Sequence, residues 1–145
     1  MNREILFKAK RKDSGEWVEG YYIYHIKRTI CPFGDSVKPE DEQHVIMQDG
    51  FSDWNMPRDT VVYEIDPDTI CQYTGLTDKN GQKIWENDIV ELPDENVYFK
   101  CEWEKDTARF VLNGDRFTVD FDDYREYEVE VIGNIFDNTD LLEVE

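Results

Sequence analysis

Carboxylates are the residues of this chain with the most obvious capacity for chemistry, because 34 of its 145 residues are Asp or Glu. Two carboxylates held at a suitable distance can divide the acid and base roles of glycoside hydrolysis. The densest group is Asp120, Asp122, Asp123, Glu126 and Glu128. Because so acidic a chain contains many accidental pairs, we interpret this group as a solvated acidic surface and assign no catalytic residue.

Asp78-Lys79-Asn80-Gly81 is a second place where oxygen atoms gather, and calcium is the ion to consider there. An EF-hand loop places its ligands at positions 1, 3 and 5, its glycine at position 6 and a glutamate at position 12. Here the glycine stands at position 4, counting from Asp78. The segment therefore predicts a tight turn, with Leu76 and Ile84 on the opposed arms of a hairpin.

Sulfur and imidazole ligands do not indicate a metal site. Cys31, Cys71 and Cys101 are widely separated and form no C-x-x-C pair, and a zinc site would need His25 or His44 from far along the chain. Three separated cysteines are typical of reduced intracellular thiols. The sequence also lacks G-x-S-x-G, G-x-G-x-x-G and Walker-type loops, so it predicts no cofactor, no metal and no enzymatic activity.

The net charge of −18 limits the classes of partner. Residues 1–28 hold seven Lys or Arg and four Asp or Glu, so they carry +3 and the rest of the chain carries −21. Such a field repels phosphate, which disfavours direct binding to DNA or RNA. Only the Lys8-Ala9-Lys10-Arg11-Lys12 cluster favours nucleic acid, and we interpret it as a solvated strand end.

Length and composition predict a folded protein. Aromatic residues make up 14% of the chain, which argues against disorder, and 145 residues can bury a core. No apolar run approaches the ~20 residues of a membrane span, and the amino terminus is charged. We expect a cytoplasmic protein with no membrane contact.

The elements that would position these residues are mostly strands. Ile5–Phe7 and Trp17–Tyr24 flank a polar loop containing Gly15 and predict an opening β-hairpin. Residues 27–60 have no sustained period and predict an irregular connection, with one strand near 44–48. We expect this connection and the hairpin to form one part, residues 1–60, and residues 61–145 another, unless the two are one continuous domain.

The second half predicts an antiparallel meander. Strands are expected at 61–65, 70–73, 97–103 and 109–112, and Asn113-Gly114 should turn the chain into a strand over 117–121. Glu86-Asn87-Asp88 interrupts two apolar runs, where short polar side chains can bond to the backbone and bend the chain. Strict alternation over 126–131 predicts a strand with one packed and one solvated face.

Four short motifs in order resemble the YopX family. They are Gln72-Tyr73-Thr74-Gly75-Leu76, Asp78-Lys79-Asn80-Gly81, Ile84-Trp85-Glu86-Asn87-Asp88-Ile89-Val90 and Val131-Ile132-Gly133-Asn134-Ile135-Phe136-Asp137-Asn138, and Phe7-Lys8-Ala9 also fits. The chain departs from the family pattern at Asn87, where glycine is common, and at Asn138–Leu142, where Asn-Pro-Glu-Leu-Leu is typical. Asparagine tolerates left-handed φ almost as well as glycine, so the first departure leaves the turn intact.

The resemblance implies a protein encoded by phages or prophages of Gram-positive and gut bacteria, with no established biochemical activity and no catalytic residue to carry over. The fold it implies is mainly β, of a β-rich α+β class. An amino-terminal hairpin would precede a small antiparallel pseudo-barrel from about residue 60, and a short helical turn near Leu141 would end the chain.

Two classes of function follow. The first is a non-enzymatic protein that assembles with itself or binds a host or phage protein, and the acidic body could imitate nucleic acid as a decoy. The second is an enzyme or a protein that binds a small ligand or nucleotide, with a pocket near the 27–60 loop. A homo-oligomer would use an exposed strand edge, for which 126–131 is a candidate.

Overall fold

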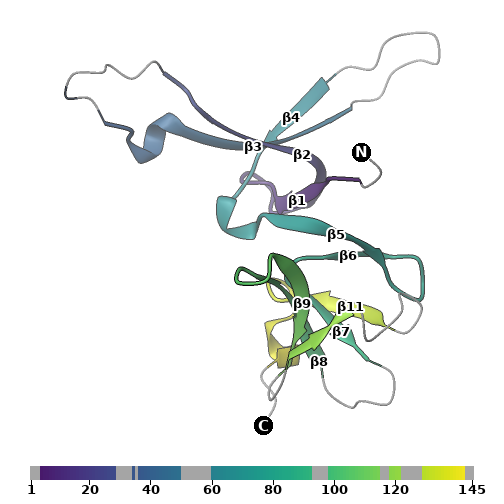
Figure 1. Ribbon diagram of the computed structural model, residues 1–145. Helices are drawn as coiled ribbons and strands as arrows, with labels where there is room; N and C mark the ends of the chain where they lie inside the picture. The colour runs from purple at the N-terminus through teal and green to yellow at the C-terminus, as the bar shows by residue number, and fades with distance from the viewer. Residues whose placement is uncertain are drawn as a thin grey trace. The chain divides into compact units, whose positions relative to one another are not determined.

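The computed structural model describes residues 4–28, 34, 36–49, 60–92, 98–114, 118–121 and 129–142, and these residues contain strands and short 3-10 turns but no α-helix (Figure 1). The strands are β1 (Phe7–Lys10), β2 (Trp17–Ile26), β3 (Glu42–Asp49), β4 (Thr60–Glu64), β5 (Cys71–Thr77), β6 (Lys83–Trp85), β7 (Asp88–Glu91), β8 (Tyr98–Glu104), β9 (Arg109–Asn113), β10 (Thr118–Asp120) and β11 (Glu130–Asn134). The 3-10 turns are η1 (Pro39–Asp41), η2 (Pro67–Thr69) and η5 (Thr139–Leu142). Within these ranges no helix is long and apolar enough to cross a bilayer.

All these strands belong to two antiparallel sheets, of six and five strands. The chain divides into two compact units, an amino-terminal unit of Ile5–Ile70 and a carboxy-terminal unit of Cys71–Glu145, to which Met1–Glu4 also belong. In the amino-terminal unit the strand order is β4-β3-β2-β1. A single bridge between Arg11 and Ile65 joins the end of β1 to the end of β4. The core of this unit consists of Ala9, Ile46 and Ile65, against which Phe7, Val18, Tyr22 and Ile70 pack.

The carboxy-terminal unit contains the β5–β6 hairpin and the five-stranded sheet, in the order β10-β9-β8-β7-β11. The strands that follow one another from β7 to β10 are also neighbours in the sheet, as expected for a meander. β11 returns to the free side of β7, with an irregularity between Val131 and Gly133. Its buried core is the larger one, comprising Ile84, Val90, Leu92, Phe99, Cys101, Leu112, Val119 and Val129.

Most of the expected strands are confirmed. The opening hairpin, the strand near 44–48 and the Leu76–Ile84 hairpin all form, and β9 pairs with β10 so that Asn113 lies opposite Thr118. Residues 126–128 of the expected alternating strand lie outside the described residues, and β11 begins at Glu130. The predicted helical turn is confirmed as η5.

Two expectations of the fold class need correction. The described residues form no α-helix, because their apolar positions alternate or run continuously over short segments bounded by turn residues. The described strands also do not close into a barrel. In the five-stranded sheet β10 and β11 are the two edges and do not pair with each other.

Candidate interaction surface

Asp78, the first residue of the possible calcium loop, holds a turn together. Its Oδ1 accepts hydrogen bonds from the backbone N–H groups of Asn80 and Gln82, both at 2.9 Å, and its Oδ2 accepts from the N–H of Val131 at 2.9 Å. The side chain is only 3% exposed, and Gly81 has the positive φ of 77° that the turn requires. The predicted turn is therefore confirmed, with both carboxylate oxygens of Asp78 used by the backbone.

The Glu86-Asn87-Asp88 bend is built in the same way. Asn87 has a φ of 71°, the left-handed conformation that glycine adopts most readily and asparagine tolerates. The buried carboxylate of Asp88 accepts a hydrogen bond of 2.8 Å from the N–H of Trp85. These short polar side chains bend the chain between β6 and β7, as the sequence predicts.

The last motif, residues 131–138, also determines the conformation of a turn. Asn134 Oδ1 accepts from the N–H groups of Phe136 and Asp137, both at 2.9 Å, while Asn138 Oδ1 accepts from the N–H of Asn134 at 3.2 Å. A Cβ on Gly133 would overlap the Asn138 side chain. Glycine at 133 thus makes room for the amide that closes the turn.

The other residues considered for chemistry are not gathered into a site. No group of three or more His, Cys, Asp or Glu able to hold a metal occurs in the described parts of the chain. Cys71 and Cys101 are buried thiols outside any disulfide of the described residues, and burial raises the pKa of the Cys101 thiol well above its usual value. Cys31 lies outside the described residues, as do Asp122, Asp123, Glu126 and Glu128, whereas Asp120 forms an ion pair with Arg109 at 2.8 Å.

The two histidines are separated in their roles as well as in sequence. His25 is exposed on β2, whereas Nδ1 of half-buried His44 lies 2.6 Å from the Tyr22 hydroxyl. The His44 ring stacks on Tyr22, with centroids 5.9 Å apart, and lies 4.9 Å from the ring of Tyr24. His44 is therefore part of an aromatic cluster on the sheet.

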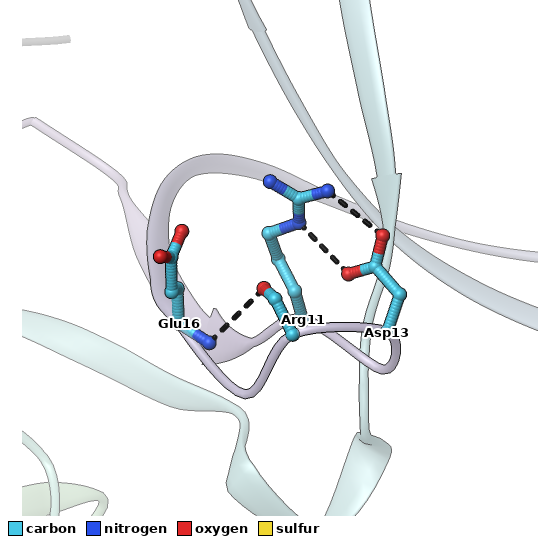
Figure 2. A network of polar contacts seen from close by, with 4 residues as sticks. Arg11, Asp13 and Glu16 are labelled. Carbon is cyan, nitrogen blue, oxygen red and sulfur yellow. Dashed lines mark hydrogen bonds and ion pairs between the residues drawn. The ribbon is translucent and has the colours of Figure 1, made fainter.

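The basic cluster at residues 8–12 is engaged with neighbouring side chains. The Nζ atoms of Lys8 and Lys10 lie 4.6 and 5.4 Å from the centre of the Trp17 ring. Arg11 donates to both carboxylate oxygens of Asp13, at 3.0 and 2.8 Å (Figure 2). This charge-assisted pair raises the pKa of Arg11 and lowers the pKa of Asp13.

An open hollow of about 470 Å³ lies beside this pair and is lined by Arg11, Lys12, Asp13, Val62, Tyr63 and Glu64. The Arg11 guanidinium lies over the Tyr63 ring at 4.5 Å, and Lys12 Nζ is 3.6 Å from Glu64 Oε1. Two cations and two carboxylates thus face one another around a phenol ring. The basic strand end predicted from the sequence is present, and two of its four cations, Arg11 and Lys12, pair with carboxylates.

A different surface stands out because it has almost no charge. Tyr21–Ile26 of β2 pair residue by residue with Glu42–Met47 of β3, and we call these twelve residues the ribbon. Glu42 is their only carboxylate and none is Lys or Arg, in a chain of which 34% is charged. β4 pairs with Val45–Asp49 of β3 and the N–H of Ile65 donates to the carbonyl of His44, so among the described residues the end of the ribbon beyond His44 has two strands.

Both faces of the ribbon expose large apolar side chains. Tyr21 and Ile23 point to one face, with exposed fractions of 57% and 38%, and Tyr24 and Ile26 point to the other, with 46% and 37%. The Tyr24 hydroxyl donates to Glu42 Oε1 at 3.1 Å. Desolvation and this carboxylate raise the pKa of Tyr24, so its hydroxyl stays neutral and donates to Glu42.

This surface is not apparent from the sequence. Tyr21-Tyr22-Ile23-Tyr24-His25-Ile26 predicts a strand, but a continuous run does not say which side chains are buried. Composition does not distinguish this run, because residues 29–34, 43–48, 69–77 and 131–136 also contain no Lys, Arg, Asp or Glu.

The YopX protein family model matches residues 6–143. The chain belongs to the YopX family. The contacts of Asp78, Asn87 and Asn134 explain in physical terms why the motifs shared with this family define turns.

A solved structure supports the fold of this YopX-family protein. Protein EF1440 from Enterococcus faecalis, known from a crystal structure, is similar over 98% of this chain and 100% of its own, with 22% sequence identity and a TM-score of 0.51. At that identity the likeness concerns the fold alone. No match among curated proteins reaches significance.

Proposed function

We propose that this YopX-family protein is a non-enzymatic interaction protein, encoded by a phage or prophage, that binds a protein partner through the ribbon. The observation that carries the proposal is the exposure of Tyr21, Ile23, Tyr24 and Ile26 on a surface with a single carboxylate. The cores of protein interfaces are depleted of charge and enriched in aromatic residues. Exposed apolar side chains that are contiguous, rather than scattered, are typical of interaction sites.

Binding of a partner would also stabilise the ribbon itself. An isolated two-stranded hairpin is marginally stable in water, because it has little apolar surface to bury on either face. The carbonyl of His44 accepts from the N–H of Ile65 at 3.0 Å, and beyond this bond the end of the ribbon, where Ile26 lies opposite Glu42, has no third strand among the described residues. A partner that covers these side chains would supply the missing burial.

The test is to change the ribbon without touching the core. We expect the wild-type protein to self-associate or to retain a specific host or phage protein, and the double variant Tyr21→Lys, Ile23→Lys to lose that association. Trp103→Lys is the matched control, because Trp103 is 47% exposed on β8 of the other unit. If the double variant keeps every association of the wild type, the ribbon is not the interaction surface.

The acidic body suggests a class of partner. A net charge of −18 attracts basic proteins at long range and could imitate nucleic acid, so the protein would act as a decoy for a basic surface. Pull-down from a host lysate at physiological salt should then recover a basic partner. Recovery of neutral or acidic partners alone would argue against the decoy role.

The hollow beside Arg11 favours a second candidate function, the binding of a small ligand or nucleotide near the 27–60 loop. It is lined by Val62, Tyr63 and Glu64, which follow that loop, and Arg11 and Lys12 supply cations. Isothermal titration with mononucleotides would detect binding that Arg11→Ala abolishes and Arg109→Ala, in the other unit, preserves. Absence of heat with the wild type would exclude these ligands.

A further inference from the structure

Along the ribbon, the outer edge of β2 has no neighbouring strand among the described residues. The N–H of Lys27 donates to the carbonyl of Asp41 at 2.7 Å, so the odd-numbered residues of β2 direct their backbone groups towards β3. The even-numbered residues direct their backbone groups to the opposite edge, the edge that pairs with β1. There the carbonyl of Glu16 accepts from the N–H of Arg11, and Gly20 pairs with Phe7. β1 ends its pairing at Gly20, and across the described residues the backbone groups of Tyr22, Tyr24 and Ile26 at this edge have no partner.

This edge lacks the features that prevent pairing in monomeric proteins. Natural edge strands are protected by charged side chains, proline, bulges or short length. From Tyr21 to Ile26 the edge contains neither proline nor a formally charged residue, and its pairing with β3 is regular. Because its backbone donors and acceptors are available, another extended strand can add to it.

We propose that a second copy of this chain adds to the edge, so that β2 pairs antiparallel with β2 of the partner across a two-fold axis at Tyr24. This inference rests on the proposed interaction role of the ribbon and names its partner. In this register Tyr22 lies opposite the partner's Ile26, Tyr24 opposite the partner's Tyr24, and Ile26 opposite the partner's Tyr22. In this register Tyr22, Tyr24 and Ile26 each gain a hydrogen-bonded partner, and none of the three pairs with Gly20, which β1 already occupies.

Side-chain chemistry favours a second copy over an unrelated strand. Aromatic residues directly opposite aromatic or β-branched residues stabilise antiparallel pairs, and the register produces such pairs at all three positions. On the other face Lys27 lies diagonally opposite the partner's Glu19, and the symmetry repeats this pair of opposite charges. A two-fold contact is isologous, so one self-complementary surface suffices and the assembly closes as a dimer.

The test uses the symmetry at Tyr24. In Tyr24→Lys two lysines face each other across the axis, and in Tyr24→Glu two glutamates do, so we expect each variant alone to be monomeric where the wild type has twice the monomer mass by light scattering. Mixing the two variants in equal amounts should restore the dimer, because lysine then faces glutamate. Tyr24 is exposed, and circular dichroism of each variant should match the wild type.

A cross-link checks the register independently. Hydrogen-bonded residues of an antiparallel pair have Cα atoms about 5.5 Å apart, within the range that a disulfide spans. Tyr24→Cys in a Cys31→Ser background should therefore form a disulfide-linked dimer on mild oxidation, and Val62→Cys in the same background should remain monomeric. Cys71 and Cys101 are buried and do not compete.

Three results would overturn the inference. The first is a wild-type protein that stays monomeric up to about 100 μM. The second is a dimer that persists in both Tyr24 variants, and the third is a mixture of the two variants that remains monomeric. A monomeric wild type that binds another protein, and loses it in the Tyr21→Lys, Ile23→Lys variant, would overturn the second-copy inference while leaving the interaction role in place.

Discussion

Asp78 shows how a polar residue in this protein determines conformation. Its carboxylate accepts three backbone hydrogen bonds, two within its own turn and one from Val131 of β11. The same turn is tied a second time to the chain before β11, because the N–H of Lys79 donates to the carbonyl of Val129 at 2.9 Å. A short side chain thus connects two segments that are far apart in sequence.

We expect Asp78→Ala to lower the free energy of unfolding by about 3 kcal/mol. Hydrogen bonds to a charged group each contribute roughly 1.5–3 kcal/mol, and the loss is smaller than the sum of three because some of the freed N–H groups bind water instead. Urea denaturation measures the change. Asp106→Ala, an exposed acid in the turn after β8, should stay within about 0.5 kcal/mol of the wild type. Equal effects of the two substitutions would show that Asp78 has no special structural role.

Asn87 permits a test of backbone conformation. Its φ of 71° is accessible to glycine, so Asn87→Gly should change stability by less than about 0.5 kcal/mol despite losing the contact with Cys71 Sγ at 3.6 Å. Asn87→Ala loses the same contact and adds the left-handed strain of about 1–2 kcal/mol. Thermal unfolding should therefore rank alanine clearly below glycine, and the reverse order would contradict the conformational role.

At the scale of the elements, an ion pair holds the segment that leads into the ribbon. Arg28 Nε donates to Asp41 Oδ1 at 2.9 Å, and Asp41 Oδ2 accepts from the N–H of Lys38 at 3.1 Å at the start of η1. The bond from Arg28 lowers the pKa of the Asp41 carboxyl below its usual value of 3.8. The connection between β2 and β3 is therefore fastened where the ribbon ends.

This lowered pKa gives the contact a defined pH dependence. Since the folded protein prefers the carboxylate, the contribution to stability is present above pH 3.8 and is lost as the pH falls through the lower pKa of the folded state. In Arg28→Ala the midpoint of the Asp41 carboxyl titration, followed by NMR, should move upward. Arg109→Ala should leave it in place, and an unchanged midpoint in Arg28→Ala would assign the shift to another cause.

The elements also show which parts of the structure the sequence could predict. Turns made by Asp78, Gly81, Asn87 and Asp88 were predictable because their conformations are fixed by neighbouring residues. The ribbon was not, because its exposure depends on where β1 ends beside β2 and where β4 ends beside β3. These limits are set by contacts between distant segments, which short-range patterns do not contain.

At the scale of the whole molecule, each unit has a core of its own, and the two cores differ in size. Eight residues form the buried cluster of the carboxy-terminal unit, including Phe99 and Leu112, against three in the amino-terminal unit. We expect amide hydrogen exchange to be slower in β7–β9 than in β2–β3, because local opening costs less where fewer apolar side chains are buried. Equal protection of both units would show a single cooperative structure.

The bridge between Arg11 and Ile65 has a consequence for the order of folding. Each neighbouring pair among β1, β2, β3 and β4 is consecutive in the chain, whereas this bridge brings together the two ends of the unit. Closing the longest loop costs the most chain entropy, so the bridge should form after the hairpins and fray before them. The first opening of the amino-terminal unit would then separate the end of β1 from the end of β4, while the pairing of β1 with β2, β2 with β3 and β3 with β4 remains.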